Sequence, residues 1–147
     1  KGYNINVPLP PGSGHGAYMA VMERVIVPTL TAYKPDLIVV PSGFDASGLD
    51  PMGRMLLSSG TYVEMTKVLK QLAADLCGGR LLYVHEGGYS AVHAPFCAHA
   101  VIEELCDAPN RIEDPFDALL QGMGGQQLYP HQEAVIGKAA RVAAAVK

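Results

Sequence analysis

The sequence has no basic run, no long apolar run and no Cys-x-x-Cys pair. With a formal net charge of −3 and no cluster of Lys or Arg, it lacks the electrostatic footprint of a nucleic-acid or anionic-membrane binder. No stretch approaches the roughly 20 apolar residues of a membrane span, and the start is unlike a signal peptide. The odd number of cysteines (Cys77, Cys97, Cys106) argues against a disulfide framework or zinc ribbon. We expect free thiols, buried rather than reactive, in a reducing compartment such as the cytoplasm.

The composition is that of a globular chain. It has 147 residues, 49% hydrophobic and 17% charged, which is enough to build one sizeable core. The chain starts at Lys1 without an initiator Met and enters a strand-like run almost at once, which predicts a fragment of a longer protein. A processed or tagged chain is the alternative.

Hydrophobic periodicity predicts alternating strands and helices. Alternating polarity over residues 3–7 predicts a strand that ends in a proline-rich loop. Ser13 is a candidate cap for a helix over residues 17–33, in which apolar residues recur at helical spacing and which Pro28 should kink without ending it. The short apolar run at residues 37–40 predicts a strand buried on both faces.

The same alternation continues along the chain. Ser58 or Ser59 is expected to cap a helix that runs to about residue 76, with Gly78 just past its end. Residues 80–84 predict a second apolar strand, followed by a helix at 94–105, a loop at 107–115, a short helical turn at 116–120 and a helix at 132–146. This order predicts an α/β fold, a parallel sheet covered by helices.

Asp45 stands just past the first apolar strand of this pattern. Ligand groups in open α/β sheets lie beyond the carboxyl ends of such strands, facing a crevice. Gly43 lets the backbone turn before Asp45, and Asp50-Pro51 carries the loop away after it. Asp45 is therefore a candidate functional carboxylate. The alternative is that it only caps a turn, where Asp is common.

The second strand ends in Glu86-Gly87-Gly88-Tyr89. In a parallel sheet this end and the Asp45 loop lie at the same edge. Paired glycines let a backbone approach a ligand closely, and the Tyr89 hydroxyl could donate a hydrogen bond to a developing oxyanion. The alternative is a tight turn whose tyrosine packs on the surface.

These two motifs, their spacing and the preceding N-I-N-V-P-L-P-P-G-S-G resemble the carboxy-terminal part of the histone deacetylase superfamily, and most closely the bacterial, class II-like histone deacetylase-like amidohydrolases. The resemblance covers nearly the whole chain. It implies that residues 1–147 are the carboxy-terminal portion of a single catalytic domain with an arginase/deacetylase-like fold. It also implies a zinc-dependent deacylase that hydrolyses acyl-lysine or related acylated amines. The backbone carbonyl of Tyr3 matches a donor to a structural cation, K⁺, in several relatives.

The resemblance also implies roles for residues at the two strand ends. Asp45 matches an aspartate that binds the zinc ion, and its hard oxygen suits a hydrolytic zinc site. Tyr89 matches the tyrosine that polarises the amide carbonyl. Gly87 and Gly88 match residues lining the tunnel for the acyl-lysine side chain, and Met52 matches an apolar position in the tunnel wall.

The chain departs from the family pattern because it has no Asp-x-His and no His-His pair. His85, at a strand end, is predicted to be a buried structural histidine. His93 and His99 are six residues apart and do not share a helix face in the i, i+4 manner of zinc-binding helices, while His15 and His131 are expected at the surface. We therefore expect the isolated chain to be inactive, and to form a homo-oligomer or pair with the amino-terminal half of its domain.

Two other functions were compared with the enzyme. A nucleotide-binding module of doubly wound type would share the sheet, but Glu86-Gly87-Gly88-Tyr89 lacks the G-x-G-x-x-G pattern that cradles phosphates. A non-catalytic α/β scaffold or interaction domain would keep the fold without a metal and remains the alternative.

Overall fold

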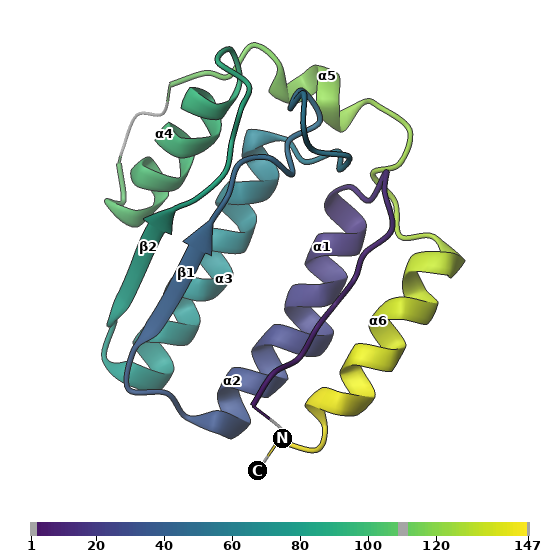
Figure 1. Cartoon of the computed structure of the whole chain (residues 1–147). Coiled ribbons are helices and arrows are strands. Elements are labelled where there is room, and N and C mark those ends of the chain that lie inside the picture. Colours follow the sequence, from purple (N-terminus) through teal and green to yellow (C-terminus); the bar gives the residue numbers. More distant parts are fainter. Residues whose placement is uncertain (1–2, 109–111, 147) are drawn as a thin grey trace.

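The computed structural model describes residues 3–108 and 112–146 (Figure 1). The elements follow in the order α1 (His15–Val21), the π-helical segment η1 (Met22–Ile26), α2 (Val27–Tyr33), β1 (Ile38–Ser42), α3 (Ser59–Cys77), β2 (Leu81–His85), α4 (Ala94–Leu105), α5 (Asp117–Gln121) and α6 (Pro130–Ala143). None of the helices in these residues is both long and apolar enough to cross a membrane.

Strands β1 and β2 pair in parallel, with Ile38 opposite Leu81 and Ser42 opposite His85. Helix α3 connects them, so the unit is a β-α-β crossover, and α4 packs against α3 (Figure 1). The predicted α/β class with a parallel sheet and helices is confirmed. Both strands end at the same edge of the sheet, so the loops that follow them lie together.

Helices cover one face of the two strands. Ile38 is buried, and Val40 and Tyr83 pack on the core beneath the sheet, whereas Val39 and Leu82, on the opposite face, are each about half exposed. The prediction that the first strand is buried on both faces is therefore wrong for this chain. In the described residues no helix or strand lies over that second face. Core-facing and exposed side chains therefore alternate along each strand.

The predicted strand at residues 3–7 is also wrong, because the structure has an extended segment there that pairs with no strand among the described residues. Ile5 and Val7 pack on the cluster that α6 forms with α1 and η1. The alternating polarity is satisfied by burial against helices rather than in a sheet. Ser13 does not cap the first helix. Gly14 holds the cap position, and the buried Ser13 hydroxyl donates to the carbonyl of Pro10 at 2.7 Å.

The predicted helix at 17–33 is one continuous helical run, α1-η1-α2, that begins two residues earlier. Pro28 lies in the first turn of α2 and does not end the run, as predicted. Since proline has no N–H to donate, the regular i→i−4 ladder is interrupted there. The turn before it widens, and the Val27 N–H donates to the carbonyl of Met22, five residues back.

The later helices match their predictions closely. Ser58 caps α3 by accepting from the Thr61 N–H, and Gly78 ends it with φ +61°, where a side chain would be strained. Helix α4 has the predicted bounds, while α5 and α6 are displaced by one to three residues. Part of the predicted loop at 107–115 lies outside the described residues. Cys77 and Cys97 are buried as expected, but Cys106 is exposed.

Candidate functional site

The loops after β1 and β2 meet directly beyond the sheet. The Glu86 N–H donates to the carbonyl of Ser42 at 3.1 Å, and the Phe44 N–H donates to the carbonyl of Gly87 at 2.8 Å. The hydrogen-bond ladder between β1 and β2 thus continues for one step beyond the last paired residues of the two strands. It fixes the start of the Asp45 loop against the start of the Gly87-Gly88-Tyr89 segment.

The carboxylate of Asp45 lies between the backbones of two glycines. A Cβ atom at Gly87 would come within 2.3 Å of Asp45 Oδ2, and one at Gly43 would come within 2.8 Å of Oδ1. Neither position has room for a side chain while Asp45 stays in place. Asp45 is partly buried, and no residue in the described part of the chain donates a hydrogen bond to its carboxylate.

Gly88 has φ +132°, a conformation that other residues adopt only with strain, and a Cβ there would lie 3.0 Å from that of Phe44. Gly88 and Tyr89 line an open depression of about 430 Å³, together with Phe44 and His85 and residues of α4. The part that Gly87 and Gly88 play in a substrate tunnel stays a prediction. Their placement beside Asp45 and Phe44 explains why both are glycine.

Tyr89 and Met52 are exposed, at 60% and 72% of their surface. Both backbones are tied to one carboxylate, that of Asp50. Tyr3, the third predicted site residue with an exposed side chain, begins the described chain, whose amino-terminal segment starts at the end of the molecule away from the two strand-end loops (Figure 1). The structure therefore brings Asp45, Tyr89 and Met52 to one edge and leaves Tyr3 apart, where its predicted cation site stays untested.

Asp50 was missed as a site residue by the sequence analysis. Its Oδ1 accepts from the N–H groups of Met52 and Gly53 at 2.8 and 2.9 Å, and its Oδ2 accepts from those of Tyr89 and Ser90 at 2.7 and 3.2 Å. Desolvation raises the pKa of Asp50, but the four N–H donors outweigh it and hold the pKa below its ordinary value. The Asp-Pro-x-Gly sequence signalled only the local turn, because the contact with Tyr89 spans 39 residues.

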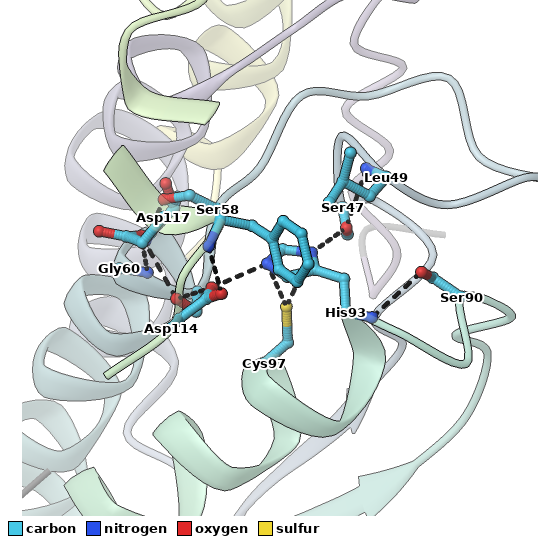
Figure 2. A network of polar contacts seen from close by, with 12 residues as sticks. Ser47, Leu49, Ser58, Gly60, Ser90, His93, Cys97, Asp114 and Asp117 are labelled. Carbon is cyan, nitrogen blue, oxygen red and sulfur yellow. Dashed lines mark hydrogen bonds and ion pairs between the residues drawn. The ribbon is translucent and has the colours of Figure 1, made fainter. Parts of the chain in front are cut away.

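His93, at the start of α4, is fully buried at the centre of a polar network behind the Asp45 loop (Figure 2). Its Nδ1 lies 2.6 Å from the Ser47 hydroxyl and its Nε2 lies 2.9 Å from Asp114 Oδ2. The tautomer with a proton on Nε2 donates to Asp114 and accepts from Ser47, which satisfies both ring nitrogens. The His93 N–H also donates to the Ser90 hydroxyl, next to Tyr89.

Asp114 extends this network to α3. It accepts from the Ser59 hydroxyl at 2.6 Å, and Asp117 accepts from the Gly60 N–H at 2.8 Å (Figure 2). Desolvation raises the pKa of Asp114, but hydrogen bonds from Ser59, the Phe116 N–H and His93 lower it by more. The pKa of Asp114 is therefore below its ordinary value. A carboxylate thus faces His93 inside the protein.

Ser47, His93 and Asp114 are the residue types of a nucleophilic triad. With exposed fractions of 1% and 0%, Ser47 and His93 are closed to any substrate, so we assign the three a structural role. This role corrects the sequence analysis, which gave the buried structural position to His85. His85 is exposed, and its ring packs 5.6 Å from that of Phe44.

The other histidines lie away from Asp45. His15 is half-buried rather than exposed, with Nδ1 3.2 Å from the Thr61 hydroxyl. His99 is exposed and pairs with Glu103 at 3.1 Å, and His131 is exposed as expected. In the described residues no group of three His, Cys, Asp or Glu side chains could hold a metal ion. Asp45, a carboxylate at the strand ends without donors among the described residues, could supply one zinc ligand.

Two tyrosines, the half-buried Tyr18 and the buried Tyr62, lie within the electrostatic influence of Asp45. Burial first, and then the charge of Asp45, raise the pKa of Tyr18. Burial also raises the pKa of Tyr62, whose hydroxyl has no hydrogen-bond partner in the described structure. Tyr18 and Tyr62 line a cavity of about 220 Å³ under β1. Both phenols stay protonated at neutral pH.

Comparison with known proteins supports the family suggested by these loops. Residues 1–105 match the family described as "Histone deacetylase domain". The chain is 50% identical over 115 residues to the histone deacetylase-like amidohydrolase of Pseudomonas aeruginosa, covering 78% of this chain and 30% of that protein. It is 36% identical over 134 residues to histone deacetylase 8 of Arabidopsis thaliana, covering 90% and 33%.

The fold agrees with this match. The solved structure described as "Crystal Structure of HDA15 HD domain" superposes with a TM-score of 0.77 at 27% identity, over 97% of this chain and 36% of that one. The chain therefore spans about a third of the length of the relatives it matches. It carries part of a deacetylase-like fold, including the two strand-end loops. The chain belongs to the histone deacetylase family.

Proposed function

We propose that the complete protein carrying this chain is a zinc-dependent deacylase that hydrolyses acyl-lysine or a related acylated amine. The observation that carries the proposal is the carboxylate of Asp45. It lies at the carboxyl edge of the strands against the backbone of Gly87, and within the described chain it accepts no hydrogen bond. A carboxylate that is held in position without donors is available to a cation.

Asp45 supplies one ligand of the proposed centre. A catalytic zinc ion normally uses three protein ligands, and the described residues hold no group of three. We therefore propose that the other ligands, and the histidine that acts as general base, come from parts of the protein outside this chain. A zinc ion held there supplies Lewis-acid polarisation of the amide carbonyl and activation of water.

Tyr89 is proposed to act on the substrate. Its hydroxyl donates a hydrogen bond to the carbonyl oxygen and strengthens that bond as negative charge develops during attack by water. A donor of this kind contributes about 3 to 4 kcal/mol to lowering the barrier. We propose that the wall along the acyl-lysine chain consists of Gly87, Gly88 and Met52. Gly88 keeps this wall thin because it has no side chain.

The exposed face of the two strands supports a second part of the proposal. Val39, Leu82 and Val84 present apolar side chains there, with exposed fractions of 42% to 51%. We propose that the amino-terminal half of the same domain covers this face in the complete protein, or that a second copy covers it in the isolated chain.

The test compares two substitutions in the complete protein. Asp45→Ala removes the ligand and should abolish both stoichiometric zinc and turnover of an acetyl-lysine peptide. Tyr89→Phe should leave the zinc content normal and lower kcat by on the order of a hundredfold or more. Asp36→Ala and Tyr33→Phe are matched controls, because both residues are exposed and precede β1, whereas Asp45 and Tyr89 follow the strands.

Retention of stoichiometric zinc by Asp45→Ala would show that Asp45 is not a ligand. A near-normal kcat for Tyr89→Phe would reduce Tyr89 to a turn residue. The rival function is a non-catalytic scaffold, which would keep the fold without a metal. It predicts that the unsubstituted complete protein binds no zinc, which metal analysis would detect directly.

A further inference from the structure

The carboxylate of Asp50 connects the loop after β1 to the loop after β2. Both of its oxygens are used, and each accepts two backbone N–H groups. One oxygen closes the turn at Met52 and Gly53 within its own loop. The other reaches Tyr89 and Ser90 in the second loop, at 2.7 and 3.2 Å.

This connection lies where the sheet no longer holds the second loop. The last backbone hydrogen bonds between the two loops are those of Phe44 with Gly87 and of Glu86 with Ser42. Beyond Gly87 the chain passes through Gly88, whose φ of +132° turns it away from strand geometry. The Tyr89 side chain is 60% exposed, so packing within this chain does little to hold it. The Tyr89 and Ser90 N–H groups are fixed by Asp50.

We propose that Asp50 is a positioning residue that sets the backbone of Tyr89 relative to the Asp45 loop. The inference rests on the proposed function of Tyr89 and adds a residue to it. One side chain thus bridges the two sides of the site, because Asp50 follows Asp45 by five residues and its carboxylate reaches the loop of Tyr89, while Ser90 is also bonded to the start of α4. The depressed pKa of Asp50 is consistent with a carboxylate that stays ionised and keeps all four donors at neutral pH.

Substitution by asparagine separates the role of the Asp50 carboxylate as a hydrogen-bond acceptor from the space that its side chain fills. Asp50→Asn keeps the shape of the side chain, but its amide nitrogen faces two N–H donors in place of an acceptor. One pair of N–H groups then loses its partner, and the other pair faces a neutral amide oxygen in place of a charged carboxylate oxygen, so the hydrogen bonds to Tyr89 and Ser90 are weaker in either orientation. Asp50→Glu keeps the charge and moves it outward by one methylene, so it tests whether position or charge matters.

The first test measures the backbone directly, in the complete protein. Amide hydrogen exchange in Asp50→Asn should be faster in a peptide covering residues 86–92 and unchanged in one covering residues 62–74 of α3. Asp36→Asn, an exposed aspartate at the other end of β1, is the control and should leave both peptides unchanged. Unchanged exchange at residues 86–92 in Asp50→Asn would overturn the inference.

The second test is a kinetic cycle with Tyr89→Phe. Asp50→Asn should lower kcat by about tenfold to a hundredfold with little change in KM, because misplacement of a group that acts in the transition state costs turnover. Asp50→Glu should also lower kcat although it keeps the charge. In the Tyr89→Phe background, Asp50→Asn should cause almost no further loss, because both changes remove the same interaction.

The outcomes separate this inference from the function on which it rests. A normal kcat for Tyr89→Phe alone would contradict the proposed function of Tyr89 and the inference with it. If Tyr89→Phe is impaired but Asp50→Asn keeps a normal kcat, or multiplies the loss equally in both backgrounds, only the inference about Asp50 is wrong. A lower melting temperature with normal kcat in Asp50→Asn would assign Asp50 to stability alone.

Discussion

Cys97 is a reactive type of side chain made inert by its position. It is fully buried behind His93, with its sulfur 3.6 Å from the His93 Nδ1 atom. Burial, and then the charges of Asp114 and Asp117, raise the pKa of the Cys97 thiol to about 12. The thiolate is the nucleophilic form, so Cys97 remains a small apolar packing residue across the physiological pH range.

We predict that iodoacetamide modifies the folded chain at Cys106 and not at Cys97 or Cys77. Cys106 is exposed and the other two are buried. Raising the pH from 7 to 9 should leave Cys97 unlabelled, because a pKa raised from 9.0 to about 12 keeps the thiol protonated through that interval. Mass spectrometry of tryptic peptides checks this. Cys106→Ser should abolish labelling, and modification of Cys97 without unfolding would contradict the prediction.

At the level of single residues, the sequence allowed some positions to be predicted and not others. Asp45 and Tyr89 follow short apolar strands, so their place at one sheet edge could be deduced from local pattern. Asp50 and His93 depend on partners 39 and 46 residues away for the contacts that define them. No periodicity records such contacts, and for that reason the buried structural histidine was assigned to the wrong position.

Among the elements, α3 shows how a helix start is secured by several donors and acceptors at once. The Ser58 hydroxyl accepts from the Thr61 N–H, and Asp117 accepts from the Gly60 N–H at 2.8 Å. Orphan N–H groups of the first turn are thus paired although this end is buried. Asp117 also accepts from the Ser59 hydroxyl, which donates to Asp114, the partner of His93. The start of α3 is therefore connected through the His93 network to Ser47 in the Asp45 loop.

Loss of the cap should be measurable in the stability of the protein. Ser58→Ala should lower the free energy of unfolding by about 1 kcal/mol, because the Thr61 N–H loses its side-chain acceptor. Ser58→Gly should lower it by only a few tenths of a kcal/mol, since glycine is tolerated at this position. Urea denaturation of both variants provides the comparison. A glycine variant less stable than the alanine variant would argue against capping as the cause.

Elements with a strong local signal were predicted well. Helix α4 has the bounds expected from its apolar spacing, and the capped, glycine-ended pattern of α3 fixed both of its ends. Residues 3–7 were predicted wrongly as a strand, since alternation reports a side that is buried and not what buries it. Here helices do so, with Ile5 and Val7 against the cluster containing Ile136.

For the molecule as a whole, the order of elements was enough to predict the parallel sheet but not its covering. A crossover helix between two strands implies parallel pairing. Whether a face of the sheet stays exposed depends on how many layers of helices cover the sheet. The apolar strands led us to predict two such layers, one on each face. The described chain provides helices on one side only, which leaves Val39, Leu82 and Val84 exposed.

The isolated chain should therefore self-associate and show neither deacylase activity nor tight zinc binding. Light scattering on the purified chain should detect species larger than 15.6 kDa. The double variant Val39→Glu, Leu82→Lys places charge on the exposed face and should shift the chain toward monomer. Val142→Glu, at a half-exposed position on α6, is the control and should not. A monomeric, chelator-sensitive deacylase would contradict the prediction.

The π-helical segment η1 has a consequence for which mutations the protein can tolerate. Segment η1 packs on α6, whereas α2, directly after it, packs on α3. Each residue of a helix turns the chain by about 100°, so the wide turn offsets the faces of α1 and α2 relative to a regular helix. Deletion of any one residue between Met22 and Ile26 would rotate the helix on one side of the deletion relative to the helices it packs against. Many single substitutions there leave the rotational offset between α1 and α2 unchanged. Insertions and deletions are therefore the changes to which this helix is most sensitive.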